Sequence, residues 1–265
     1  MLFTAIRAAL HAGNEILKIY NDPDSDFGIE RKADNSPLTR ADKQAHATIV
    51  SYLEQTPYPV LSEEGRHMDY AVRREWDWLW IVDPLDGTKE FIKKNGEFTV
   101  NIALVNQGVP VLGVIYVPVR QELYFAADSL GAYKLCDISF LQPSDTLDTL
   151  VGRACRLPMV QSSRQSFVIV ASRSHLTPET EAYIEEMKRI HSCVETVSSG
   201  SSLKICQVAE GTADVYPRFA PTMEWDTAAG HAIARAAGRN IWHTNLETPL
   251  TYNKEDLLNP WFIVK

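Results

Sequence analysis

Apolar residues recur at helical spacing in two segments near the beginning of the chain. In residues 1–20, apolar and small side chains three or four positions apart share one face, and polar residues interrupt the run. This spacing predicts an amphipathic first helix and not a targeting peptide. A second helix is predicted over about 39–53, with Ala45, Ile49 and Leu53 inward, and the polar stretch between the two predicts a mobile loop or a short hairpin. The apolar face of the first helix comprises Leu2, Ile6, Leu10, Gly13, Leu17 and Tyr20.

The apolar runs that follow are short enough to be strands. A short strand is predicted at "YPVLSEE", and a five-residue strand at "WLWIV". In residues 98–126, three further runs are separated only by Asn-Gln-Gly and Pro-Val-Arg: "FTVNIALV", "VPVLGVIYV" and "ELYFAA". Strands joined by connections this short predict an antiparallel meander.

From residue 167 the pattern alternates between strands and helices, which implies layered sheets with helices packed between and outside them. Residues 127–166 carry several Ser, Asp and Pro residues and show no motif. We therefore expect a domain boundary in this region, and divide the chain into an N-terminal α+β domain, 1–130, and a C-terminal α/β domain, 131–265. The expected strands are "FVIVAS", 194–197 and "ADVYPRF", and the expected helices are 178–191, one after Gly200, and 225–237.

Composition narrows the class of protein. The formal net charge of −8 argues against a nucleic-acid groove, although a bound metal could reverse the local sign for an anionic substrate. None of the four cysteines forms C-x-x-C, and the histidines show no H-x-x-x-H or H-E-x-x-H, which weakens a zinc hypothesis and fits reduced thiols in a cytosol. No apolar run could span a bilayer. We expect a cytoplasmic protein, leave open peripheral attachment to the cytoplasmic face of the inner membrane, and find no signal for an oligomeric state.

Two aspartates stand three residues apart after the strand "WLWIV", in the segment "VDPLDGTKEF". Proline cannot continue a hydrogen-bond ladder, so the strand is expected to end there and to deliver Asp83 at the sheet's edge. The turn can aim Asp83, Asp86 and an intervening carbonyl at one point, and Mg²⁺ prefers such a mixture of oxygens. Gly87 lets the backbone approach a ligand closely, and the N–H groups after it can open a helix that favours an anion.

Other interpretations of this segment are open. A proline-initiated turn with an aspartate at a capping position is common. Haloacid-dehalogenase phosphatases place D-x-D-G-T after an apolar strand, with the first Asp as nucleophile, but the spacing here is D-x-x-D-G-T. A non-catalytic sensor of Mg²⁺ or nucleotide is the alternative to an enzyme.

Further acids lie at the ends of other predicted elements. Glu63 and Glu64 end the strand "YPVLSEE", and strands that end on one side of a sheet share a ligand crevice. Asp226 lies at the start of the small-residue helix "WDTAAGHAI", where a helix cap is the ordinary interpretation. Each acid alone is more often structural, but three such clusters together favour a metal site.

The segments "LSEE", "VDPLDGTKEFIKKNGEFTVNIAL" and "WDTAAGHAI" resemble the signature segments of the inositol monophosphatase superfamily of lithium-sensitive phosphatases. Within it the closest likeness is to bacterial 3′(2′),5′-bisphosphate nucleotidases, which "KADNSPLTRAD", "SRSH", "GSSLKICQVAEGTADVYPRF" and "LNPWF" also resemble. The likeness covers most of the chain except residues 127–166. It implies an α+β fold, a layered αβαβα sandwich with mixed and antiparallel sheets.

The implied activity is that of an Mg²⁺-dependent phosphomonoesterase. Its expected substrate is adenosine 3′,5′-bisphosphate, hydrolysed to AMP and phosphate in sulfur assimilation, with the 5′-phosphosulfate analogue as another candidate. The alternative within the superfamily is an inositol monophosphatase or a sugar bisphosphatase. Inhibition by Li⁺ at one metal site is also expected.

The resemblance implies a role for each acid. Two Mg²⁺ ions would be held by side chains and one carbonyl, and Asp34 in the loop "RKADNSPLT" would carry a third ion. Glu63 and Thr88 would position the attacking water, and Asp42 would accept a hydrogen bond from the threonine. The ligands of the two ions would be Glu63, Asp83, the Leu85 carbonyl, Asp86 and Asp226.

The substrate would be bound by other groups. The backbone N–H groups of Gly87 and Thr88 would hold the scissile phosphate, and Asp226 would also contact the substrate. A nucleoside bisphosphate has a second phosphate that needs cations, and Arg can hold phosphate through two hydrogen bonds. The expected partners of that phosphate and of the purine are Ser201, Lys204, Arg218 and, for the base, His175.

Overall fold

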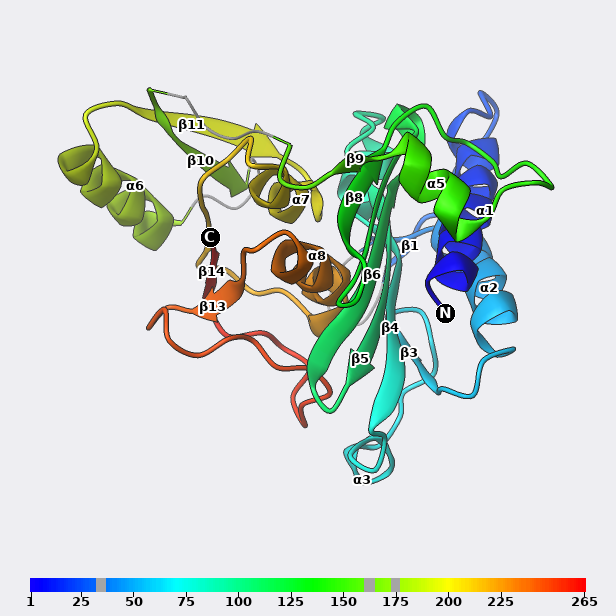
Figure 1. Cartoon of the computed structure of the whole chain (residues 1–265). Coiled ribbons are helices and arrows are strands. Elements are labelled where there is room, and N and C mark those ends of the chain that lie inside the picture. Colours follow the sequence, from blue (N-terminus) through cyan, green and yellow to red (C-terminus); the bar gives the residue numbers. More distant parts are fainter. Residues whose placement is uncertain (32–36, 160–164, 173–176) are drawn as a thin grey trace.

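The chain folds into alternating layers of helices and sheets (Figure 1). The structure is a computed structural model that describes residues 1–31, 37–159, 165–172 and 177–265. Helices α1 (Leu2–Tyr20) and α2 (Arg40–Leu53) form one outer layer, and a seven-stranded sheet lies beneath them. Helices α7 (Leu203–Glu210) and α8 (Glu224–Ala236) cover the opposite face of that sheet. Smaller sheets and helix α6 (Pro178–Ile190) complete the sandwich, so the expected αβαβα architecture is confirmed.

Both predicted N-terminal helices form where their apolar spacing places them. Leu10 of α1 and Ile49 of α2 are fully buried in one cluster with side chains from the sheet. A Cβ at Gly13 would collide with the ring of Tyr116, so glycine permits the close approach of α1 to the sheet. The stretch between the helices contains the expected hairpin, with β1 (Glu30–Arg31) antiparallel to β2 (Pro37–Leu38).

The large sheet contains the predicted meander. Its order is β3-β4-β5-β6-β7-β8-β9; β3 and β4 pair in parallel, and every other pair is antiparallel. Side chains of each strand alternate between the two faces, and both faces are covered by helices, so its strands read as nearly continuous apolar runs. The strands are β3 (Val60–Ser62), β4 (Trp78–Asp86), β5 (Thr99–Asn106), β6 (Val109–Val117), β7 (Glu122–Ala127), β8 (Gly131–Leu135) and β9 (Cys155–Arg156).

The prediction that the strand "WLWIV" ends before Pro84 is wrong. Strand β4 continues to Asp86 through a β-bulge: Asp83 lies opposite Asn101 and Asp86 lies opposite Thr99, with a register shift between them. In a regular strand, residues three apart point to opposite faces. Because Thr99 and Asn101 are two apart and share a face, the bulge puts both aspartates on that same face. The proline is tolerated because the bulge interrupts the ladder there.

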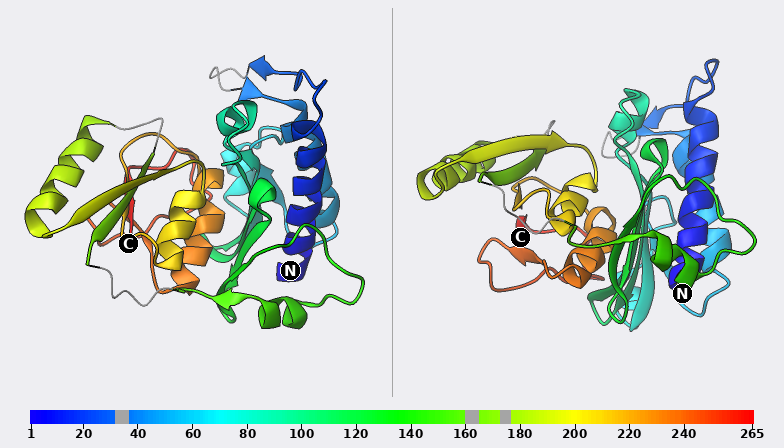
Figure 2. Two further views of the ribbon diagram at one scale, coloured as in Figure 1. Left: turned by 90° about the horizontal axis from the view of Figure 1, so that it is seen from above. Right: turned by 45° about the horizontal axis from the view of Figure 1, so that its top comes forward.

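The second half of the chain packs on the face of the large sheet that carries Asp83 and Asp86, and it contains the outer sheets (Figure 2). A Cβ at Gly113 would collide with the Ala229 carbonyl, so α8 lies very close to β6. Strands β10 (Phe167–Ser172) and β11 (Val194–Ser199) are parallel, and β12 (Tyr216–Arg218), β14 (Phe262–Val264) and β13 (Ile241–His243) form an antiparallel sheet. The remaining short elements are α3 (Tyr70–Arg73), α4 (Thr88–Ile92), η1 (Pro118–Arg120) and α5 (Leu147–Arg153).

The central stretch without motifs joins the first sheet. Strands β8 and β9 extend the large sheet to Arg156, beyond the predicted division at residue 130. The two-domain division stays a prediction. Within the described ranges, none of the helices has both the length and the apolar character needed to cross a bilayer.

Candidate metal and phosphate site

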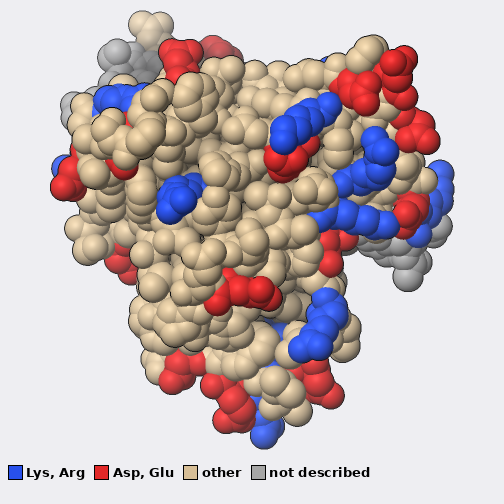
Figure 3. All heavy atoms as spheres, turned by 90° about the vertical axis from the view of Figure 1, so that its right-hand side faces the viewer, with Lys and Arg blue, Asp and Glu red and all other residues tan. Residues whose placement is uncertain are grey.

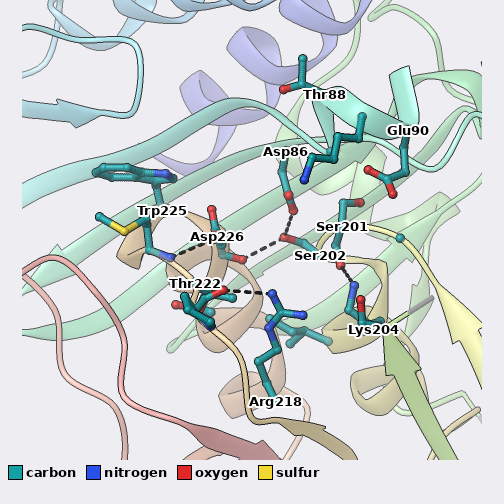
Figure 4. A pocket seen from close by; sticks show the side chains of 18 of the residues that line it. Asp86, Thr88, Glu90, Ser201, Ser202, Lys204, Arg218, Thr222, Trp225 and Asp226 are labelled. Atoms are coloured by element: carbon teal, nitrogen blue, oxygen red, sulfur yellow. Dashed lines mark hydrogen bonds between the residues drawn. The ribbon is translucent and has the colours of Figure 1, made fainter. Parts of the chain in front are cut away.

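Three aspartates from distant parts of the chain meet where β4 ends and α8 begins. Each of Asp83, Asp86 and Asp226 offers a carboxylate oxygen, and these oxygens all lie within 4.8 Å of one another. The β-bulge aims the first two toward α8, and the third belongs to the first turn of α8. Figure 4 shows Asp86 and Asp226 turned toward the same pocket. The expected convergence of these carboxylates is therefore present.

The cluster is electrostatically unfavourable without a cation. Burial, followed by the negative charges of Glu63, Asp86 and Asp226, raises the pKa of the Asp83 carboxyl well above its usual value. Burial and the charges of Asp86 and Glu63 likewise raise the pKa of Asp226, and the hydrogen bond from the Met223 N–H, followed by the charge of Arg218, opposes this rise. Buried like charges at this separation destabilise the fold unless a counter-charge is present. A set of carboxylate oxygens at the end of a strand fits a hard divalent cation.

The other predicted metal ligands do not belong to the group of three aspartates. Glu63 follows β3 and donates its backbone N–H to the Val82 carbonyl at 3.1 Å, and its carboxyl group helps to raise the pKa of Asp83. It lines the pocket but lies outside the tight group of three. The Leu85 N–H donates to Asp83 Oδ1 at 3.0 Å, so this turn fixes the orientation of Asp83. The Leu85 carbonyl and Glu63 stay predictions as ligands, and Asp34 lies outside the described residues.

A hydrogen-bonded pair stands beside the acids. Thr88 Oγ1 donates to Asp42 Oδ1 at 3.2 Å. Asp42 is 2% exposed and accepts at Oδ2 from the backbone N–H and hydroxyl of Thr39, at 2.7 and 2.5 Å. Thr39 and Asp42 form the capping box of α2, a T-x-x-D signal that is readable from the sequence. Asp42 is therefore a fixed acceptor and not the surface acid that the sequence alone suggests.

Gly87 shapes the turn between the acids and Thr88. It has φ +96°, in the left-handed region, and directly precedes the short helix α4, as the sequence predicted. A Cβ here would lie 3.3 Å from the Glu97 carbonyl and 3.3 Å from the Ser201 Cβ. Glycine thus lets β4 and the segment before α7 come together at the site.

A pocket of about 460 Å³ opens beside the acids, and it is lined by the two basic side chains predicted to bind phosphate, Lys204 and Arg218. Lys204 is buried and donates to the carbonyls of Ser201 at 2.6 Å and Ser199 at 3.3 Å. Burial lowers its pKa to about 8, helped by Arg218 and opposed by Asp86. Arg218 donates from Nη2 to the Pro221 carbonyl at 3.0 Å, while its buried Nε has no hydrogen-bond partner among the residues that the structure describes. A buried donor without a partner is unusual and indicates a missing acceptor.

Ser201 lines the pocket, but its hydroxyl already donates a hydrogen bond within the protein. It has φ +40° and donates to the Glu97 carbonyl at 3.1 Å. The predicted helix is α7, which begins at Leu203, so Ser201 precedes its first turn. Its role in binding stays a prediction, as do those of Lys204 and Arg218, and His175 lies outside the described residues.

Several pocket residues were not singled out from the sequence. Ser202 hydrogen-bonds Asp86, Asn101 hydrogen-bonds both of them, and Trp225 and Met223 also line the pocket. Ser202 lay next to a predicted residue, but a small hydroxyl inside a helix-starting segment carries no distinctive pattern. Trp225 directly precedes Asp226, and an aromatic side chain there is more often part of a core.

The comparisons with known proteins agree with this geometry. The model of the inositol monophosphatase family matches residues 1–260. The 3′(2′),5′-bisphosphate nucleotidase CysQ of Escherichia coli (strain K12) is 45% identical over 267 residues, which cover 100% of this chain and 99% of that protein. The protein of the same name from Haemophilus influenzae is 32% identical and covers 100% of this chain and 92% of its own.

Solved structures give the same result. CysQ from Bacteroides thetaiotaomicron, a bacterial member of the inositol monophosphatase family, is 65% identical, with a TM-score of 0.93 over 100% of this chain and 96% of that chain. An inositol monophosphatase from Anabaena (Nostoc) sp. PCC 7120 is 26% identical, with a TM-score of 0.68 over 100% and 89% of the two chains. The family model covers nearly the whole chain and these relatives cover all of it, so the chain belongs to the inositol monophosphatase family.

Proposed function

We propose that this protein is an Mg²⁺-dependent phosphomonoesterase that removes the 3′-phosphate of adenosine 3′,5′-bisphosphate, giving AMP and phosphate, in sulfur assimilation. The observation that carries the proposal is the position of two basic side chains, Lys204 and Arg218, in the same pocket as Asp86 and Asp226 of the acid cluster. One end of the pocket suits a metal-bound phosphate and the other a second phosphate. Its similarity to proteins named bisphosphate nucleotidases supports this choice of substrate.

The acids would hold the cations as follows. Asp83, Asp86 and Asp226 would form the core of the site, with Glu63 and the Leu85 carbonyl completing two Mg²⁺ sites and Asp34 serving a third. When bound, such ions supply Lewis acidity and neutralise negative charge on phosphate oxygens. The raised pKa values of Asp83 and Asp226 support occupation by cations, because a cation removes their mutual repulsion.

The chain's own groups would orient the attacking water. The Thr88 hydroxyl donates its proton to Asp42, so its oxygen can accept a hydrogen bond from water. Thr39 holds Asp42 in place through two hydrogen bonds. Because Asp42 is fixed, the hydroxyl proton of Thr88 stays directed toward Asp42 and away from the pocket. Glu63 would provide a second acceptor for the same water. Together these groups would align water for in-line attack on phosphorus.

The other groups would hold the substrate. The N–H groups of Gly87 and Thr88 would bind the scissile phosphate, and Asp226 would face it. The free Nε of Arg218 and the ammonium of Lys204 would bind the 5′-phosphate, with Ser201 beside them and His175 at the purine. A charge-assisted hydrogen bond of this kind contributes about 1.5–3 kcal/mol. Inositol monophosphate lacks the second phosphate and would leave Lys204 and Arg218 without an anionic partner from the substrate.

A substrate panel with purified protein tests the proposal. The panel comprises adenosine 3′,5′-bisphosphate, its 5′-phosphosulfate analogue, inositol 1-phosphate and fructose 1,6-bisphosphate, each with Mg²⁺, with EDTA, and with Mg²⁺ plus Li⁺. We expect kcat/KM to be highest for the nucleotides, activity to vanish in EDTA, and Li⁺ to inhibit. Preference for inositol 1-phosphate would favour the family alternative, and binding without phosphate release would favour a sensor. A phosphorylated Asp83 trapped by acid quench and found by mass spectrometry would favour the haloacid-dehalogenase chemistry.

A further inference from the structure

Ser202 occupies a helix-capping position but does not cap its helix. It is the N-cap residue of α7, is 2% exposed, and within the described part of the chain makes no side-chain cap hydrogen bond. A serine at this position usually accepts a hydrogen bond from the first turn and stabilises the helix by about 1 kcal/mol. Here the hydroxyl points away from α7, so the chain forgoes that stabilisation for another contact.

That contact joins the two halves of the acid cluster. Ser202 Oγ lies 2.6 Å from Asp86 Oδ2 and 2.9 Å from the backbone carbonyl of Asp226. Asp86 belongs to β4 and Asp226 to α8, so one buried hydroxyl contacts both elements (Figure 4). A hydroxyl has a single proton, and the shorter contact to a carboxylate takes it.

Two buried side chains on β5 determine the direction of that proton. Thr99 Oγ1 donates to Asn101 Oδ1 at 2.9 Å, which leaves the Asn101 amide nitrogen facing Ser202. Asn101 Nδ2 then donates to Ser202 Oγ at 2.8 Å. Because Ser202 accepts from Asn101, its own proton remains for Asp86. Thr99 and Asn101 are 0% and 1% exposed, so solvent does not compete for these groups.

The hydrogen-bonded chain Thr99–Asn101–Ser202, called the relay below, acts on one oxygen of Asp86. Oδ2 accepts from Ser202 at 2.6 Å and from Asn101 at 3.3 Å, whereas Thr99 Oγ1 lies 3.5 Å away and gives its one proton to Asn101 at the shorter distance of 2.9 Å. None of these donors reaches Oδ1 in the described residues, and an oxygen of Asp86 is among the atoms that converge with Asp83 and Asp226. Donors on one oxygen fix the carboxylate plane and direct the other oxygen toward a ligand.

We propose that Ser202 is a positioning residue for divalent-cation binding, and that the relay Thr99–Asn101–Ser202 holds Asp86 in its ligating orientation. The inference rests on the proposed function only in taking the acid cluster as a cation site. Loss of such a supporting hydrogen bond to a metal ligand typically costs about 10–100-fold in metal affinity. The predicted effect is therefore on cation affinity and not on the chemical step.

The test measures Mn²⁺ binding by electron paramagnetic resonance in the absence of substrate. In Ser202→Ala, we expect the dissociation constant for Mn²⁺ to rise about tenfold or more. The isosteric Thr99→Val keeps the shape of the core and should raise it by about threefold, since Thr99 acts only through Asn101 and Ser202. Thr56→Val is the matched control, because it removes a hydroxyl that accepts from Trp80 Nε1 at 2.8 Å on the other face of the sheet. It should leave Mn²⁺ binding unchanged.

The double variant Ser202→Ala/Thr99→Val distinguishes a relay from two separate structural effects. A relay predicts that Thr99→Val adds no further loss once Ser202 has been replaced, whereas independent effects would multiply. Wild-type Mn²⁺ affinity in Ser202→Ala, or in Thr99→Val if the former does not fold, would overturn the inference alone. Absence of Mn²⁺ binding to the wild-type protein would overturn both the inference and the cation site of the proposed function.

Discussion

The two faces of the seven-stranded sheet are built in opposite ways. On the face covered by α1 and α2, most buried side chains are apolar, apart from Thr39 and Asp42 at the start of α2, and acids and bases are scattered together over the outer surface (Figure 3). On the face covered by α7 and α8, apolar packing continues along most of the sheet. At the end of β4, however, it gives way to buried polar groups: Asp83, Thr99, Asn101, Ser202 and Lys204.

The difference between the two faces shows which part of the fold contains groups that destabilise it. Removing apolar area from water stabilises the first face at about 25 cal/mol per Å². The second face holds carboxylates whose pKa values are raised by burial and by each other, and these destabilise the protein at neutral pH. Groups that are costly to the fold and converge at a pocket are characteristic of functional sites. The two faces should therefore respond to mutation in opposite directions.

The largest contrast is expected from Asp83→Asn. Removing one charge from the crowded cluster should lower kcat by roughly 10²–10³-fold, the usual cost of losing a key electrostatic group. The same change should raise the melting temperature in EDTA, because the pKa of Asp83 is raised and its charged form is disfavoured in the fold. Activity assays and scanning calorimetry in EDTA measure the two effects. A variant that lost activity and also melted lower would contradict this account of the site.

The opposite result is expected from Leu10→Ala on the first face. Leu10 is fully buried against the sheet, and truncating it should lower the free energy of unfolding by about 2–5 kcal/mol. At a temperature where the variant is folded, kcat and Mg²⁺ affinity should stay within about twofold of the wild type. Urea denaturation gives the stability, with Ile49→Val as a milder matched change of about 0.5–1.5 kcal/mol. A large loss of kcat in folded Leu10→Ala would show that the two faces are not independent.

Sequence periodicity predicted the helices on both faces of the sheet, since the expected ranges 39–53 and 225–237 agree closely with α2 and α8. The helices follow from apolar residues at helical spacing, and the meander of β5, β6 and β7 follows from apolar runs separated by short connections. The short strands β8, β9, β13 and β14 were missed, since two to five residues are too few to show a period. Their pairing depends on partners that are distant in sequence.

For the site, the sequence identified the acids but not how they meet. The rule that proline ends a strand misplaced the end of β4, and the bulge that turns Asp83 and Asp86 to one face depends on pairing with β5. Asp42 was assigned from the family resemblance alone, although its capping box with Thr39 was readable. Ser202 could not be predicted, because its contact with Asp86 joins residues 116 positions apart.

A smaller effect, confined to the second face, is expected from Arg218→Ala. Its unpartnered Nε would lose the proposed contact with the second phosphate, so KM for adenosine 3′,5′-bisphosphate should rise about 10–100-fold. Hydrolysis of a simple monoester such as p-nitrophenyl phosphate should change little. Arg153→Ala is a control, because that arginine pairs with Asp145 away from the pocket. Equal losses on both substrates would reject the assignment of Arg218 to the second phosphate.

The smallest effect should appear in the pH dependence of KM. With a pKa of about 8, Lys204 is about nine-tenths charged at pH 7 and about one-tenth charged at pH 9. Its attraction for the second phosphate is therefore present below pH 8 and lost above it, so KM for the bisphosphate should rise by up to about tenfold between pH 7 and 9. Dividing this KM by that of a simple monoester at each pH cancels changes in the metal site and in the phosphate ester. The rise in this ratio should be absent in Lys204→Met, and a ratio that stays flat in the wild-type protein would place the second phosphate away from Lys204.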